Sequence, residues 1–215
     1  MKSTKLLGIS KDTSTILFDM FQEIYGISRF EFFINQEQYL EPFMPVLQYS
    51  YEAHPMNSYS EISGAVFFGT SGASNKRAIF DYFFSEFQVD KERYQQLVHP
   101  TSYLALSSKL EKGVLIEPKT VIGSQSSIGF GVFVKRGASI GHHNSIGDFT
   151  DINPGAVLSG KVNVGPGCTI GSGAVIKDNI NIGANTVIGI GSVVTKDIPA
   201  NCIAFGNPCK VVKEI

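Results

Sequence analysis

An aliphatic residue recurs at every sixth position over almost half of this chain. Val, Leu or Ile occupies each step from Val98 to Val194 without an insertion. Gly follows many of these aliphatics, and a small or β-branched residue lies four positions after most of them. A fixed short period that fits neither an α-helix nor an ordinary strand indicates a solenoid. The pattern predicts a triangular coil, in which each hexapeptide supplies one flat face and one corner.

Three hexapeptides complete one coil, so equivalent positions of successive coils form vertical columns. We expect the aliphatic residue and the small residue of each hexapeptide to point inward. Coils then stack at the strand spacing of about 4.8 Å. Each buried aliphatic contributes roughly 1.5–3 kcal/mol before the entropy of chain ordering is counted. We attribute the recurring glycines, such as Gly141, to turn conformations that a side chain resists.

The first ninety residues carry a different pattern. Short apolar segments at 6–9, 30–34 and 65–68 predict strands, and helical spacing at 16–24 and 79–87 predicts two helices. We expect Gly26 to end the first helix and Ser74 or Asn75 to cap the second. Strand–helix–strand order predicts a small parallel α/β domain of βαβ, Rossmann-like type. We therefore expect an α/β domain at 1–92, a β-helix at 93–198 and a C-terminal cap at 199–215.

Composition excludes several classes of function. A formal net charge of −1 argues against nucleic-acid binding. No apolar run approaches the ~20 residues of a membrane span, and the first residues are too polar for a signal peptide. Three cysteines without a CxxC pair, and four scattered histidines, favour a reducing cytoplasm and no metal site.

The N-terminal domain offers loops at the carboxyl ends of its predicted strands, where α/β domains bind nucleotides. The candidate substrate-binding residues are Ser10, Lys11, Asp12, Asn35 and Gly72. No GxGxxG fingerprint is present, so dinucleotide binding is not supported. Two interpretations stay open: the domain only caps the open end of the solenoid, or it caps the solenoid and also binds the substrate.

Two adjacent histidines interrupt the repeat at a corner, in Ile140-Gly141-His142-His143-Asn144-Ser145-Ile146. One interpretation is a pair of solvated turn residues. The other is a general base, because an ordinary imidazole, with a pKa near 6.5, can accept a proton from an attacking amine or hydroxyl at neutral pH.

The repeat from about residue 98 to 212 resembles the hexapeptide-repeat acyltransferases, which implies a left-handed parallel β-helix. The segment from Ile140 to Phe149 resembles the subfamily of sialic acid O-acetyltransferases and bacterial nucleotide-amino-sugar N-acetyltransferases. This resemblance places His142 on the catalytic position. The acid that follows the base in that subfamily is replaced by His143. Asp148 is a candidate substitute for that acid, and His143 is a second candidate base.

The same resemblance implies roles for residues further along the chain. Gly160, one coil after His142, matches a backbone N–H that reaches the acetyl carbonyl oxygen. Asp151 stands where relatives carry a histidine near the acyl-CoA. The other expected acyl-CoA contacts are Ser172, Gly189, Ile190, Pro208 and Lys210. Pro208 and Lys210 belong to a segment with a second interpretation, a turn that only ends the solenoid. The glycine-rich first loop and the acidic pair of the relatives are missing, so the acceptor is expected to differ from theirs.

The resemblance implies an acetyltransferase that uses acetyl-CoA as co-substrate and acts as a homotrimer. The expected acceptor is the amine of a nucleotide-linked amino sugar, in bacterial surface-polysaccharide or glycan biosynthesis, by direct transfer with a histidine base. One alternative is O-acetylation of a sugar hydroxyl, as on a sialic acid. Another is a non-catalytic structural solenoid. A γ-carbonic anhydrase is disfavoured, because His99 is distant in the chain from His142 and His143.

Overall fold

The computed structural model describes residues 3–37 and 48–215, and it divides the chain into two compact units. The first unit comprises Met1–Ser71 and Asn75–Gln95, and the second comprises Gly72–Ser74 and Gln96–Ile215. The first is a small α/β domain and the second a left-handed parallel β-helix, which confirms the expected fold class. Within the described ranges, no helix is long and apolar enough to cross a bilayer.

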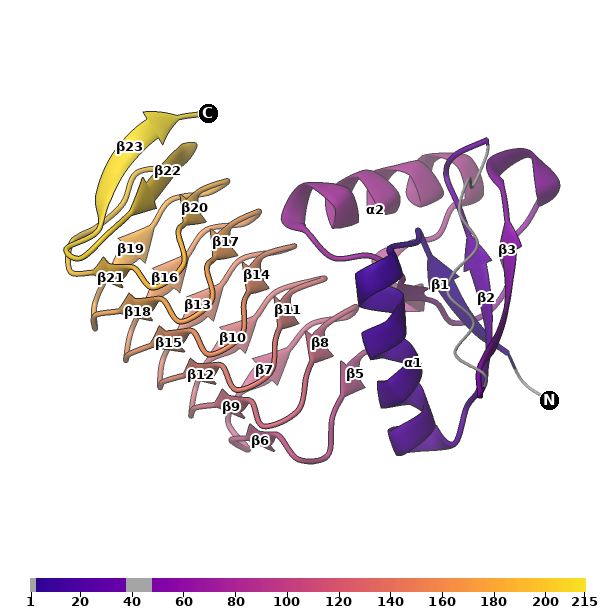
Figure 1. Ribbon diagram of the computed structural model, residues 1–215, viewed down its shortest axis with the longest axis horizontal. Helices are drawn as coiled ribbons and strands as arrows, with labels where there is room; N and C mark the ends of the chain where they lie inside the picture. The colour runs from indigo at the N-terminus through magenta and orange to yellow at the C-terminus, as the bar shows by residue number, and fades with distance from the viewer. Residues whose placement is uncertain (1–2, 38–47) are drawn as a thin grey trace. The chain divides into compact units, whose positions relative to one another are not determined.

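Three sheets make up the β-helix (Figure 1), and their strands are parallel except for the last, β23. Most of these strands are two residues long. Strands of one sheet pair in register one coil apart, as Ser139 pairs with Val157. The first sheet contains β5 (Leu97–Val98), β8 (Leu115–Ile116), β11 (Phe133–Val134), β14 (Asp151–Ile152), β17 (Thr169–Ile170), β20 (Val187–Ile188), β22 (Cys202–Phe205) and β23 (Lys210–Glu214). The second contains β6 (Tyr103–Leu104), β9 (Val121–Ile122), β12 (Ser139–Ile140), β15 (Val157–Leu158), β18 (Val175–Ile176) and β21 (Val193–Val194). The third contains β7 (Lys109–Leu110), β10 (Ser127–Ile128), β13 (Ser145–Ile146), β16 (Asn163–Val164) and β19 (Asn181–Ile182).

The aliphatic residue of each hexapeptide points into the β-helix, as the period predicts. From Ile116 to Val194 these side chains are at most 3% exposed. Small residues such as Ala138 and Ala156 fill the space between them. Val98, Leu104 and Leu110 are only partly buried, because they belong to the first coil, which has a neighbouring coil on one side. The interior is therefore a mainly apolar column, with a few buried polar side chains near the corners.

The recurring glycines have a different cause from the one expected. Gly141 has no left-handed backbone; a Cβ on it would lie 2.6 Å from the carbonyl oxygen of Ser159 on the next coil. Gly123 meets the backbone of Gly141 in the same way, also at 2.6 Å. Left-handed φ values fall instead at every sixth residue from 113 to 191, including His143 at 58°. The glycine after each aliphatic residue therefore leaves room for the backbone of the next coil.

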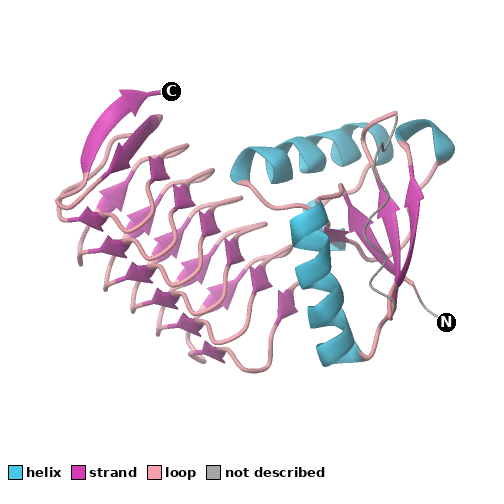
Figure 2. Cartoon of the chain, in the orientation of Figure 1, coloured by secondary structure: helices cyan, strands magenta, loops and turns pink. Residues whose placement is uncertain are grey.

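The α/β unit combines helices with one parallel sheet (Figure 2). The strand order of this sheet is β3-β2-β1-β4. Its strands are β1 (Thr4–Leu7), β2 (Arg29–Phe33), β3 (Ser50–His54) and β4 (Phe67–Phe68). Its helices are α1 (Lys11–Tyr25) and α2 (Ala73–Phe87), with short 3-10 turns η1 (Met56–Ser58) and η2 (Lys91–Arg93).

Two details of this unit differ from expectation. Strand β3 was not predicted, because Tyr51 and Ala53 give it only a short, weak alternation. Helix α2 begins at Ala73, so Ser74 and Asn75 lie in its first turn and do not cap it. Gly26 ends α1 with a left-handed φ of 67°, as predicted.

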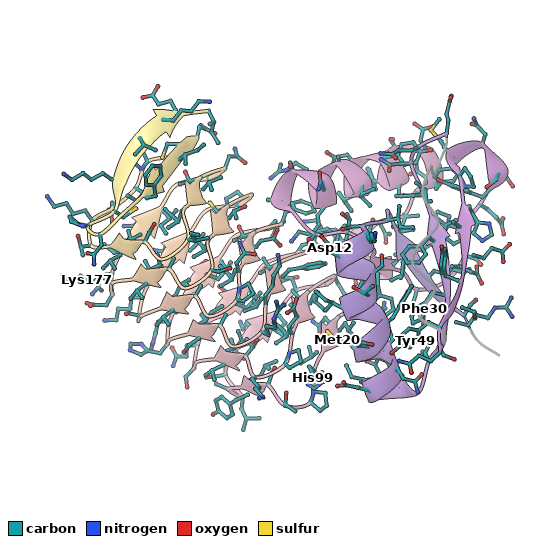
Figure 3. The ribbon with its side chains drawn as sticks, in the orientation of Figure 1. Asp12, Met20, Phe30, Tyr49, His99 and Lys177 are labelled. Atoms are coloured by element: carbon teal, nitrogen blue, oxygen red, sulfur yellow. The ribbon has the colours of Figure 1, made fainter. Side chains whose placement is uncertain are left out.

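Aromatic side chains form much of the core of the α/β unit. Phe18 of α1 stacks on Phe30 with ring centroids 4.2 Å apart. Phe21 meets Phe67 edge to face at 4.8 Å. Tyr49 contacts Phe30 at 6.3 Å, and both residues are labelled in Figure 3. Aromatic pairs contribute about 0.5–1.5 kcal/mol beyond the area they bury, so they hold α1 on the sheet.

A hairpin ends the chain. Strand β22 continues the first sheet beside β20, and β23 pairs with β22 in the antiparallel sense. Every residue of β23 is exposed. The turn between them contains Pro208 after a cis peptide bond, and Lys210 begins β23.

Candidate active site

The histidine pair lies at the corner where the second sheet passes into the third. Strand β12 ends at Ile140 and β13 begins at Ser145, and both imidazoles between them are exposed. The backbone N–H of His143 donates to the carbonyl oxygen of Ser124 on the preceding coil at 2.8 Å. Coil stacking therefore fixes the backbone from which both rings project.

The two imidazoles contact each other through their δ nitrogens. Nδ1 of His142 lies 2.9 Å from Nδ1 of His143, and the rings meet edge to face at 89°. A hydrogen bond between two such nitrogens needs one proton, donated by one ring and accepted by the other. If His142 donates that proton, its Nε2 is a bare acceptor whenever the ring is neutral.

His143 has an unusual backbone for a residue with a side chain. Its φ of 58° is in the left-handed region, which non-glycine residues adopt at some energetic cost. Lys161 occupies the same corner position one coil later, with the same φ of 58°. The β-helix geometry imposes this conformation, and it directs the His143 ring toward Nδ1 of His142.

Gly160 provides the surface on which the His142 ring lies. A Cβ on Gly160 would be 2.6 Å from both Nε2 and Cε1 of His142, so glycine leaves the imidazole the place it occupies and a side chain there would push the ring aside. Lys161 N–H donates to the His142 carbonyl oxygen at 2.8 Å, which joins the two coils. Among the residues that the structure describes, no group accepts a hydrogen bond from the Gly160 N–H.

Asp148 does not accompany the histidines, contrary to the sequence-based hypothesis. It lies at the next corner, between β13 and β14, where its Oδ1 accepts the Phe130 N–H at 2.9 Å. Within residues 3–37 and 48–215, no carboxylate bonds to either imidazole. The position of the expected acid is taken by the neutral or cationic ring of His143.

Apart from Gly160, the residues predicted to contact acyl-CoA lie away from His142. Ser172, Gly189 and Ile190 lie together at the corner between the first and second sheets, where Gly191 N–H donates to the Ser172 carbonyl at 2.9 Å. Ile190 is 81% exposed. The second sheet separates this corner from the one that carries His142.

Asp151 and the C-terminal residues occupy other places on the β-helix. Asp151 is on β14 of the first sheet and 2% exposed; its Oδ2 accepts the N–H of Gly72, a member of the same unit, at 2.8 Å. Cys209, next to Pro208 in the final turn, donates its N–H to the Val193 carbonyl of β21 at 2.8 Å. This bond places the final turn beside the second sheet.

A pocket of about 280 Å³ lies in the α/β unit at the carboxyl ends of its strands. Of the predicted substrate residues, Asn35 lines it, whereas Ser10, Lys11, Asp12 and Gly72 do not. Asp12 instead stands at the start of α1 (Figure 3). The remaining lining residues were not predicted: Ile9, Ile34, Gln36, Thr70, Asn75, Ala78 and Ile79. Their signal in the sequence is their position just after a strand or in the first turns of α2.

The loops around this pocket are bonded to each other. Thr13 Oγ1 donates to Ser71 Oγ at 2.9 Å, which joins the start of α1 to the loop after β4. Asn75 Nδ2 donates to the Ser71 carbonyl oxygen at 3.1 Å. In the described part of the chain, no cluster of three or more His, Cys, Asp or Glu side chains can hold a metal ion.

Comparison with known proteins shows a shared fold over the whole chain. No family model matches the chain, and no curated protein sequence matches it. A structure of GDP-perosamine N-acetyltransferase from Caulobacter crescentus, in complex with CoA and GDP-perosamine, is 20% identical with a TM-score of 0.81 and covers 100% of this chain and 98% of its own. The acetyltransferase domain of PglB from Neisseria gonorrhoeae, in complex with acetyl coenzyme A, is 22% identical with a TM-score of 0.82, over 98% and 100% of the two chains. WeeI from Acinetobacter baumannii is 21% identical with a TM-score of 0.70, over 97% and 100%.

Proposed function

We propose that this chain is an acetyltransferase that transfers the acetyl group of acetyl-CoA to the amine of a nucleotide-linked amino sugar. The observation that carries the proposal is the His142 ring, bonded at Nδ1 to His143 and lying over Gly160. The shared fold of CoA-bound acetyltransferases, one of them also bound to GDP-perosamine, supports the same donor and class of acceptor. We place the reaction in the cytoplasm, in bacterial glycan biosynthesis; the three free thiols agree with a reducing compartment.

His142 acts in this proposal as the general base. His143 accepts the Nδ1 proton of His142, which leaves Nε2 to take a proton from the acceptor. An acid at position 143 would add a negative charge to this interaction, whereas a neutral imidazole adds only a hydrogen bond. The pair therefore orients the base through a hydrogen bond and places no negative charge beside it.

The transfer itself is direct. The amine nitrogen attacks the thioester carbonyl carbon, Nε2 of His142 accepts the amine proton, and the carbon–sulfur bond breaks to release the CoA thiolate. Negative charge develops on the carbonyl oxygen during this step. The Gly160 N–H, which has no acceptor in the described structure, is the proposed donor to that oxygen. Two groups on adjacent coils thus supply the base and the oxyanion donor.

The pocket of the α/β unit is the proposed binding site for the nucleotide part of the acceptor. It lies at the carboxyl ends of parallel strands, the position at which α/β domains bind such ligands. Asn35 and Thr70 supply polar groups, and Ile9, Ile34 and Ile79 supply apolar surface for a base or ribose. This arrangement favours capping together with substrate binding over capping alone.

A homotrimer would complete the acyl-CoA site. The His142 corner and the Ser172 corner are the two edges of the second sheet. If that sheet faces a three-fold axis, the His142 corner of one copy lies beside the Ser172 corner of the next. The outward face of the second sheet supports this orientation, because Val121, Val157 and Val175 form an apolar column that is 38–41% exposed, interrupted by Ser139 between Val121 and Val157. Exposed apolar columns of this kind mark association surfaces.

The amine and hydroxyl alternatives differ in a direct assay. The chain is incubated with acetyl-CoA and a panel of nucleotide-linked amino sugars, and release of the CoA thiol is measured. A matched panel presents the corresponding hydroxyl sugars and sialic acids. Thiol release that depends on an amino sugar supports the proposal, and release only with a hydroxyl sugar supports O-acetylation. No acceptor-dependent release in either panel would favour a non-catalytic solenoid.

A further inference from the structure

A buried amide lies beneath the histidine corner. Asn144 is 1% exposed, and its side chain reaches the next coil. Nδ2 donates to the Ser159 carbonyl oxygen at 2.9 Å, and Oδ1 accepts the Val162 N–H at 2.6 Å. These partners determine which end of the amide is nitrogen, since a carbonyl only accepts and an N–H only donates. Asn144 therefore holds both ends of the corner that contains Gly160.

The Ser159 carbonyl belongs to the same peptide group as the Gly160 N–H. In a planar trans peptide, the C=O and N–H bonds point in opposite directions. Asn144 draws the Ser159 oxygen into the interior, so the Gly160 N–H faces outward at the corner that carries His142. A hydrogen bond to the carbonyl oxygen also polarises the peptide and strengthens its N–H as a donor.

Gly141 restrains the same carbonyl from its other side. A Cβ on Gly141 would lie 2.6 Å from the Ser159 oxygen, so glycine is required for that oxygen to sit where Asn144 binds it. The orientation of the Gly160 N–H thus depends on two residues of the preceding coil, neither of which presents a polar side-chain atom at the corner surface.

At other corners of the β-helix, a buried side chain bridges two coils in the same way as Asn144. Ser126, Thr150 and Cys168 each donate to the carbonyl oxygen fifteen residues further along the chain, as Asn144 does. Ser126 and Thr150 also accept the N–H eighteen residues further along. A hydroxyl is therefore sufficient to bridge two coils at this position. Position 144 differs from the others in the peptide that it holds.

We infer that Asn144 is a positioning residue for the proposed acetyl transfer, because it orients and polarises the Gly160 N–H that receives the developing oxyanion. The inference rests on the proposed function. It assigns to a buried, non-reacting side chain an effect on kcat that the equivalent residues at other corners do not have.

The test is a series of substitutions at Asn144 with a matched control. Asn144→Ser supplies a hydroxyl, Asn144→Cys a weak thiol donor, and Asn144→Ala no donor. Thr150→Val removes the same bridge at a corner without a proposed catalytic group. The steady-state constants kcat and KM for acetyl-CoA, and the Tm, are measured for each variant.

We expect kcat to follow donor strength at position 144. Asn144→Ser should keep kcat within about threefold of the parent, and Asn144→Ala should lower it at least about tenfold, with little change in KM for acetyl-CoA. Asn144→Cys should fall between them, and it carries the test if Asn144→Ala does not fold. Thr150→Val should lower Tm as Asn144→Ala does but leave kcat unchanged. Equal kcat across the series, or an equal loss in Thr150→Val, would overturn the inference.

A second measurement does not need turnover. The amide nitrogen resonance of Gly160 reports the hydrogen bond on the Ser159 carbonyl, and it should move in Asn144→Ala but stay in Thr150→Val. If the parent chain transfers no acetyl group while this resonance moves as expected, the proposed function fails and the geometric part stands. A Gly160 resonance that does not move in Asn144→Ala would overturn the orienting role itself.

Discussion

Nδ1 of His142 lies 2.9 Å from Nδ1 of His143, so the two rings share one proton at this contact. A neighbouring acid would place a negative charge beside the His142 ring, whereas the second imidazole provides only a hydrogen-bond acceptor.

Substitution of His143 should change the pH dependence of transfer. His143→Glu places a carboxylate against Nδ1 of His142, which stabilises the imidazolium. The acid limb of the kcat/KM profile should therefore move to higher pH, with activity retained above it. His143→Asn tolerates the left-handed backbone and serves as the uncharged control. A limb that stays in place in His143→Glu would show that residue 143 does not bond to the base during turnover.

Gly160→Ala should displace the catalytic ring. The new Cβ would lie 2.6 Å from Nε2 and Cε1 of His142, closer than non-bonded carbon and nitrogen atoms can approach. We expect a loss of at least about tenfold in kcat, in the range of a lost base. Gly137→Ala is the control: its φ of 69° strains an alanine, but no atom lies within 4 Å of the new Cβ, so it can lower stability without displacing a side chain. Equal effects of the two changes on kcat would contradict the packing of His142 on Gly160.

The second sheet should carry the subunit interface. We expect three copies in analytical ultracentrifugation at micromolar concentration. Val157→Glu puts a charge into the exposed apolar column and should shift the chain toward monomers with loss of activity. Ser127→Glu, on the outward face of the third sheet, should keep both the trimer and the activity. A fully active monomer in the parent protein would exclude a shared site.

The pocket of the α/β unit should determine acceptor affinity. Asn35→Ala removes a polar lining group and should raise KM for the nucleotide sugar by roughly tenfold, with KM for acetyl-CoA unchanged. Thr15→Ala, at a half-buried position of α1 that does not line the pocket, is the control. Deletion of residues 1–92 should leave a folded β-helix without transferase activity. Retained activity after this deletion would show that the domain only caps the solenoid.

We expect Cys168 to lower the free energy of unfolding as the pH rises above 9. Burial raises the pKa of its thiol from 9.0 to about 11. Above pH 9 the unfolded thiol loses its proton while the folded one keeps it, so the unfolded state binds fewer protons and stability falls as pH rises toward 11. The full effect is at most about 2–3 kcal/mol. The free energy of urea unfolding should fall less steeply with pH in Cys168→Ala, and an unchanged slope would contradict this assignment.

The sequence predicted the β-helix closely because each six-residue period corresponds to one face and one corner of the coil. The aliphatic positions from Ile116 to Val194 are all buried, and the pattern needs no tertiary information. Strand β3 lacked such a signal, since an edge strand with mixed polar residues has little periodicity.

The candidate site was only partly predictable. The corner position of His142 follows from the repeat, but its contact with His143 depends on a left-handed backbone and two side-chain torsions. Asp148 was wrong as a partner, because it follows His142 by one hexapeptide, which in this fold carries the chain through a strand to the next corner. The turn conformation predicted for Gly141 was also wrong. This glycine is needed because the backbone of the next coil approaches it closely, and the sequence of a single hexapeptide gives no signal of that contact.

The central claim is that His142 is the base of acetyl transfer, and a single-residue comparison tests it most directly. His142→Ala is assayed for acceptor-dependent release of CoA thiol beside the parent chain, with Tm and CoA affinity measured on both. Because the side chain is exposed, folding and CoA affinity should change little, and kcat should fall roughly 10²–10⁴-fold. Parent-like kcat in a folded His142→Ala variant would contradict the account.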